Sequence, residues 1–155
     1  MKRIYRVLGF CVIVSITIYS CTHVSGTYIS AHGSRAGSSM KDNCMNCHKT
    51  GATYGGFIVA GSVYAPDGNT RYPNATITLF KDSMGLVTNT ILGTIEVDGV
   101  GNFYTTHPID LSQGVHPMLS SQNGDTTMMT VTTNGACNSC HGTSIQRNIV
   151  VKSNL

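Results

Sequence analysis

The sequence contains no tryptophan and few charged residues. Only 11% of its 155 residues are Asp, Glu, Lys or Arg, and four are proline. Long surface helices are rich in Leu, Glu and Lys, so this composition argues against a mainly helical fold. The 17 glycines and the frequent Thr, Ser and Asn residues favour turns and short strands instead. The length suits one compact domain, which we expect to be mainly β.

The basic residues gather at the start of the chain. Lys2, Arg3 and Arg6 precede an uncharged apolar run over residues 7–19. This layout is typical of an export signal, and the run is shorter than the roughly 20 residues that a membrane-spanning helix needs. We predict that residues 1–20 are a signal peptide. Without it basic and acidic residues are equal in number, so nucleic acid is not an expected partner.

A cysteine follows the apolar run in a recognisable setting. The segment Ile18-Tyr19-Ser20-Cys21 resembles a bacterial lipobox, with an apolar residue three positions before the cysteine and a small residue directly before it. This resemblance predicts a lipid on Cys21 and a membrane anchor, on the periplasmic or extracellular side of the outer membrane or at the cell surface. Residues 21–40 would form a tether. The alternative is ordinary cleavage near Ser20 or Ser25, which would leave Cys21 without lipid or remove it.

Two pentapeptides further along share one pattern, Cys44-Met45-Asn46-Cys47-His48 and Cys137-Asn138-Ser139-Cys140-His141. C-x-x-C-H is the haem-attachment motif of c-type cytochromes. Two thiols at this spacing can add to the two vinyl groups of one porphyrin, and the adjacent histidine then lies under the iron. We predict two haem c groups, and export supports them because such attachment is completed outside the bacterial cytoplasm. The expected covalent residues are Cys44, Cys47, Cys137 and Cys140, and the expected proximal ligands are His48 and His141.

Two other interpretations of these cysteines fit the sequence less well. A four-cysteine zinc site commonly has about 15–20 residues between its pairs, whereas 89 separate Cys47 from Cys137. Disulfides within C-x-x-C pairs are usually redox-active, and the chain lacks the βαβ pattern of a thioredoxin-like fold. The sequence therefore favours haem attachment over both.

The second axial ligand of each iron decides between an electron carrier and an open catalytic site. For the first haem we favour His32, in the Gly- and Ser-rich stretch 31–39, because that stretch could fold back over the haem. A solvated tether histidine is the alternative role for His32. Met40 is the alternative ligand.

Four residues are candidates for the second haem. We favour His116, with His107, Met128 and Met129 as alternatives. His107 and His116 each precede a proline, so we expect both in exposed connections. The two methionines should face opposite sides of one strand, so that at most one reaches the haem.

The segment between the motifs predicts a series of short strands. Runs rich in Val, Ile, Thr, Tyr and Phe alternate with turn residues such as Pro66-Asp67-Gly68-Asn69. We expect strands over 57–64, 75–80, 91–97, 102–106 and 126–132, with an edge strand over 149–151. This spacing is typical of a β-sandwich, with its core over about 55–133.

The sandwich segment also resembles a known fold family. Val59-Ala60-Gly61-Ser62-Val63-Tyr64, Asn74-Ala75-Thr76-Ile77-Thr78-Leu79 and Asp98-Gly99-Val100-Gly101-Asn102-Phe103-Tyr104 resemble a carboxypeptidase-regulatory-like, transthyretin-like sandwich. The resemblance covers about half of the chain and implies a mainly β, Ig-like or transthyretin-like fold, with haem-binding loops or short helices at both ends. It implies no activity by itself.

With a haem motif on either side, the chain resembles the small exported cytochromes of metal-reducing and related bacteria. That resemblance implies periplasmic or extracellular electron transfer by a dihaem domain over residues 41–155, with redox proteins or an extracellular acceptor as partners. We expect an electron carrier, not an enzyme. The alternatives are a small peroxidase-like enzyme and a haem-bearing sensor or binding module. Assembly into a homo-oligomer or filament is left open.

Overall fold

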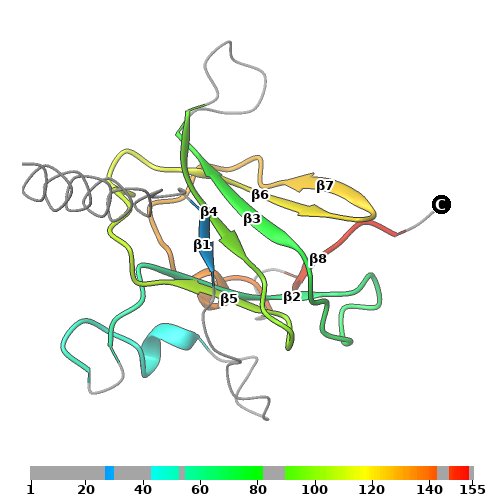
Figure 1. Ribbon diagram of the computed structural model, residues 1–155, viewed down its shortest axis with the longest axis horizontal. Coiled ribbons are helices and arrows are strands. Elements are labelled where there is room, and N and C mark those ends of the chain that lie inside the picture. Colours follow the sequence, from blue (N-terminus) through cyan, green and yellow to red (C-terminus); the bar gives the residue numbers. More distant parts are fainter. Residues whose placement is uncertain (1–26, 30–42, 53–54, 82–89, 143–146, 154–155) are drawn as a thin grey trace, which may run out of the picture.

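The protein is a two-layered β structure in the computed structural model, which describes residues 27–29, 43–52, 55–81, 90–142 and 147–153. Two β-sheets pack against each other, and the helical content of these residues is limited to short 3-10 turns (Figure 1). The prediction of a mainly β sandwich with short helices flanking it is confirmed. Within the described residues no helix is long and apolar enough to cross a membrane.

The larger sheet has five strands. They are β1 (Thr27–Ile29), β3 (Thr76–Phe80), β4 (Ile91–Glu96), β6 (His116–Ser121) and β7 (Gly124–Thr127). Their order is β1-β4-β3-β6-β7, and every neighbouring pair is antiparallel except β1 and β4.

The smaller sheet has three strands in the order β5-β2-β8. They are β2 (Val59–Tyr64), β5 (Asn102–Thr105) and β8 (Ile149–Val150). The central strand β2 pairs antiparallel with β5 and parallel with β8. A tight turn carries the chain from β4 in the larger sheet to β5 in the smaller one, and in it Asp98 Oδ1 accepts hydrogen bonds from the amides of Val100 and Asn102. Gly101 lies in this turn with a φ of 82°, a conformation that favours glycine.

The core fills the space between the two sheets. Val59 and Val63 of β2 belong to one buried cluster with Ile77 of β3, Ile95 of β4 and Phe103 of β5. These side chains point into the core, whereas the residues directly before and after them in each strand point to the other face, because side chains alternate along a strand. Burying a side chain of this size contributes about 1.5–3 kcal/mol, so this cluster holds the sheets together. The opposite face of β2 carries Ala60, Ser62 and Tyr64.

The predicted strand over 126–132 is wrong in its bounds. Strand β7 begins at Gly124 and ends at Thr127, and Met128 and Met129 follow it. The turn of the tight β6–β7 hairpin ends at Gly124, which has a φ of 99° and is the first residue of β7. The two methionines therefore do not lie on opposite sides of one strand.

His116 was expected in an exposed connection, but it is the first residue of β6 and is half-buried. The residue before a proline favours extended backbone, and extended backbone suits a strand. Pro117 sits near the strand end, where its missing N–H costs little. His107 does lie in an exposed bend, as predicted. Part of the expected tether is also a strand, since β1 pairs with β4.

Candidate haem-attachment sites

The two C-x-x-C-H motifs form separate turns with the same backbone conformation. Each begins with a 3-10 helix, η3 (Cys44–Asn46) and η4 (Cys137–Ser139). In the first motif, the amides of Cys47 and His48 donate to the carbonyl oxygen of Cys44, at 3.3 and 3.0 Å. The equivalent bonds in the second motif run to the carbonyl oxygen of Cys137 and have the same two lengths. In each motif this tight backbone turn therefore carries both cysteines and the histidine.

Asparagines fix the entrance to each turn. Asn43 precedes η3, and its Oδ1 accepts a hydrogen bond from the amide of Met45 at 3.0 Å. Asn134 precedes η4, where its Oδ1 accepts from Ala136 N at 2.9 Å and its Nδ2 donates to Ser139 Oγ at 3.1 Å. Sequence analysis missed both residues. The signal that could have found them is an asparagine one to three residues before each motif, because such side chains cap turns.

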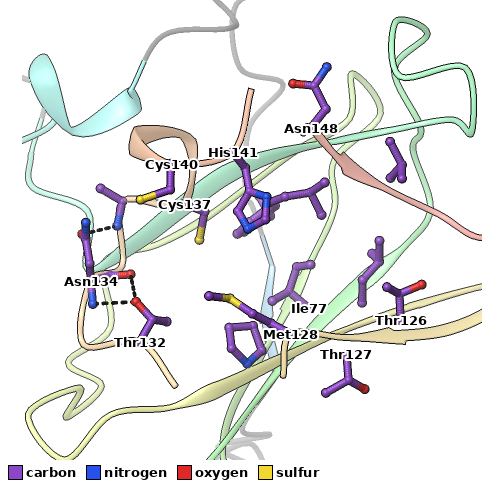
Figure 2. Close-up of a pocket in the computed structure, with 16 residues that line it drawn as sticks. Ile77, Thr126, Thr127, Met128, Thr132, Asn134, Cys137, Cys140, His141 and Asn148 are labelled. Carbon is purple, nitrogen blue, oxygen red and sulfur yellow. Dashed lines mark hydrogen bonds between the residues drawn. The ribbon is translucent and has the colours of Figure 1, made fainter. Parts of the chain in front are cut away.

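The two motifs, far apart in sequence, converge on strand β2. The amide of Ala60 donates to the carbonyl oxygen of Gly135 at 2.9 Å, and Ala60 forms a parallel bridge with Ala136. Just before β2, the amide of Phe57 donates to the carbonyl oxygen of His48 at 2.9 Å. Both η3 and η4 contact β2, and the cyan and orange turns lie near each other in both views (Figures 1 and 2).

The cysteines of the two motifs also share a pattern of exposure. Cys44 and Cys137 are half-buried, whereas Cys47 and Cys140 are exposed. Burial raises the pKa of Cys44, and burial raises the pKa of Cys137 to about 12, with the nearby Cys44 as the second cause. The first cysteine of each motif is therefore a neutral thiol at pH 7, and Cys44 lies near enough to Cys137 to raise its pKa. No disulfide joins these four described cysteines.

A buried polar network lies beneath the second motif. Asn138 Oδ1 accepts from the amide of Ser62 at 3.1 Å, and Asn138 Nδ2 donates to Ser62 Oγ at 3.2 Å. Ser62 Oγ in turn donates to Asn102 Oδ1 at 2.7 Å, which also accepts from Arg71 Nη1 at 3.1 Å. The positive charge of Arg71 partly opposes the effect of burial on the pKa of Cys44. The network thus extends from the second motif to the surroundings of the first.

The histidine of the first motif lies at one end of an aromatic stack. The imidazole of His48 stacks on Phe57, with ring centroids 4.0 Å apart and planes 8° apart. Phe57 stacks in turn on Tyr104 of β5, with centroids 4.6 Å apart. This stack positions the His48 ring against the smaller sheet.

The histidine of the second motif has the hydrogen bond expected of an iron ligand. His141 Nδ1 lies 2.9 Å from the carbonyl oxygen of Arg147. A carbonyl oxygen only accepts, so Nδ1 carries the proton and Nε2 of the neutral ring keeps its lone pair. Metal-bound histidines commonly donate their other ring N–H in this way. The second motif therefore fits haem ligation through Nε2.

A pocket of about 260 Å³ opens beside this histidine. Cys137, Cys140 and His141 line one side of it, and Met128 lines it from the segment after β7 (Figure 2). Its other walls are mostly apolar and come from both sheets. They include Ile77, Phe103, Leu119, Ile149 and Val150. An apolar pocket with a few donor groups is typical of a cofactor site.

The candidate second ligands have different positions. Of the four described candidates, Met128 lines the pocket, whereas His107, His116 and Met129 do not. Met129 is 87% exposed. His32 and Met40, predicted as ligands of the first haem, and Cys21, the predicted lipidation site, lie outside the described residues.

The described part of the chain contains no cluster of three His, Cys, Asp or Glu side chains that could hold a metal ion. The four motif cysteines are thus not gathered around one point as a tetrahedral zinc site requires.

Comparisons with protein-family models, with curated proteins and with solved structures found no match.

Proposed function

We propose that this chain is a dihaem c-type cytochrome that transfers electrons in the periplasm or outside the cell. The observation that carries the proposal is the pair of C-x-x-C-H motifs. Each motif forms its own backbone turn with the same hydrogen bonds, and both turns contact β2. A single motif could arise by chance, but two with the same hydrogen-bond geometry indicate the same chemistry at both.

The residues of each motif suit covalent attachment of a porphyrin. Haem supplies a one-electron centre whose reduction potential depends on its axial ligands and surroundings. In the second motif, Cys137 and Cys140 are thiols beside an apolar pocket, and His141 Nδ1–H is oriented by the Arg147 carbonyl. In the first, the ring stack on Phe57 holds His48. These residues hold and orient; none of them forms a hydrolytic or acid–base arrangement.

Two neighbouring one-electron centres favour a relay. The closeness of Cys44 and Cys137, together with the contacts of η3 and η4 to β2, supports electron exchange between the haems within one molecule. Its partners would be redox proteins or an extracellular acceptor. We further propose that Cys21 carries a lipid and holds the protein at a membrane, so that the relay works at that surface.

The test is the number and location of covalent haems in the mature protein. Wild type should carry two haems that remain attached after denaturation, as measured by intact mass. Cys140→Ser should retain the first haem with a weakened second attachment, and the matched variant Cys47→Ser should show the reverse, because the motifs share no cysteine. A denatured protein with fewer than two haems would contradict the proposal. Rapid carbon monoxide binding at both irons would instead indicate a peroxidase-like enzyme or a sensor.

A further inference from the structure

The pocket beside the second motif offers few groups that could bind iron. Apart from the two motif cysteines, it is lined by aliphatic and aromatic residues, threonines and two asparagines, together with His141 and Met128. Hydroxyl and amide oxygens are poor ligands for haem iron, whereas imidazole nitrogen and thioether sulfur are established ones. His141 and Met128 are therefore the two suitable axial donors among the residues that line this pocket.

The backbone holds Met128 in position. Its amide donates to the carbonyl oxygen of Pro117 at 2.9 Å, which extends the β6–β7 pairing by one bond beyond Thr127. The side chain is half-buried and points into the space between the sheets, below the second motif in Figure 2. A methionine side chain has three rotatable bonds, so its sulfur can adjust within a fixed backbone frame.

The adjacent methionine provides an internal contrast. Met129 is 87% exposed and lies outside the pocket, although it is the same type of residue and directly follows Met128 in the sequence. His116 is half-buried in β6, where it pairs with Phe80, and His107 is exposed in a bend. Neither histidine lines the pocket. The pocket thus separates Met128 from the other three candidates.

We infer that Met128 is the second axial ligand of the haem iron held by His141. This inference rests on the proposed function and deepens it by assigning the ligand pair of one site. A thioether ligand raises the reduction potential of a haem relative to a second histidine. The second haem is then the higher-potential site if two histidines ligate the first.

The experiment uses the full-length protein with both haems attached and compares Met128→Leu with the matched control Met129→Leu. Leucine keeps the apolar volume but removes the sulfur. In Met128→Leu, ferrous protein should take up one more equivalent of carbon monoxide than wild type. The ring-current-shifted methionine methyl signal should disappear from its NMR spectrum. Met129→Leu should match wild type in both measurements.

Met128→His is a second variant that keeps a ligand in place. It should bind no more carbon monoxide than wild type and should lower the potential of one haem. Unchanged carbon monoxide uptake and an unchanged methyl signal in Met128→Leu would overturn the assignment. A wild-type protein without two covalent haems would refute the proposed function itself, and the denatured mass distinguishes these two failures.

Discussion

Gly135 is the position where a single added methyl group should separate the second motif from β2. The residue is buried, and its carbonyl oxygen accepts a hydrogen bond from the amide of Ala60 at 2.9 Å. A Cβ atom at Gly135 would overlap the carbonyl oxygen of Ile58 and lie 3.1 Å from Val59 Cα. These are backbone atoms that cannot rotate away, so in Gly135→Ala the segment before η4 must move off the strand.

The expected cost has two parts. Weakening the Ala60–Gly135 hydrogen bond costs about 1 kcal/mol, and forcing extra volume into a packed backbone contact typically costs about 1–3 kcal/mol. Gly135→Ala should therefore lower the free energy of unfolding by about 2–4 kcal/mol. The measurement is urea unfolding of the purified protein, in which the variant should show a lower midpoint and an unchanged slope.

Gly99→Ala is the matched control. Gly99 lies in the turn between β4 and β5, and a Cβ atom there would meet nothing within 4 Å. This variant should stay within about 0.5 kcal/mol of wild type, as exposed substitutions usually do. If Gly135→Ala unfolds at the same urea concentration as Gly99→Ala and wild type, the described packing of the second motif on β2 is refuted.

Three further predictions concern other parts of the molecule. Ser62→Ala removes a buried hydroxyl that accepts from Asn138, so it should cost about 1–3 kcal/mol in urea unfolding, and an unchanged midpoint would count against the network. Hydrogen bonds from the Thr70 hydroxyl and nearby amides lower the pKa of Asp67. Its contribution to stability is thus present above the ordinary carboxyl pKa of about 4 and is lost as the pH falls through the lowered value. Asp67→Ala should make acid unfolding less steep, whereas identical pH profiles would show that the turn does not matter. Cys21→Ser should lose radiolabelled palmitate and move to the soluble fraction with both haems attached, and wild type that takes up no label would disprove the anchor.

Local features of the fold could be predicted from the sequence because their causes are local. The strands β2, β3, β4 and β5 agree with the predicted runs to within two residues, since Val, Ile, Thr and aromatic residues favour extended backbone over a few positions. The C-x-x-C-H turns are set by hydrogen bonds within five residues. Their chemistry could therefore be proposed without a structure.

Features that depend on distant residues could not be predicted. Strand β6 contains a proline and two serines, and its pairing with both β3 and β7 stabilises it as a strand. The neighbouring sequence does not distinguish Met128 from Met129. What distinguishes them is that Met128 lines the pocket beside the second motif and Met129 does not. The convergence of both motifs on β2 likewise follows from strand order, which the runs of residues alone do not specify.

The parallel pairing of β2 with β8 constrains how the protein is made. Residues of β8 come last among the described strands, so the smaller sheet cannot close until residues 149–150 have been made. In the closed fold, Cys137 packs against the core side of β2, where a Cβ at Gly61 would lie 2.9 Å from Cys137 Cβ. Pairings between residues so distant in sequence form slowly. If Cys137 and Cys140 bind haem as proposed, the cofactor would therefore have time to reach both cysteines before the sheet closes. We expect pulse-labelled chains to acquire haem before they resist protease, and protease resistance that precedes haem attachment would show that the closed sandwich still admits the cofactor.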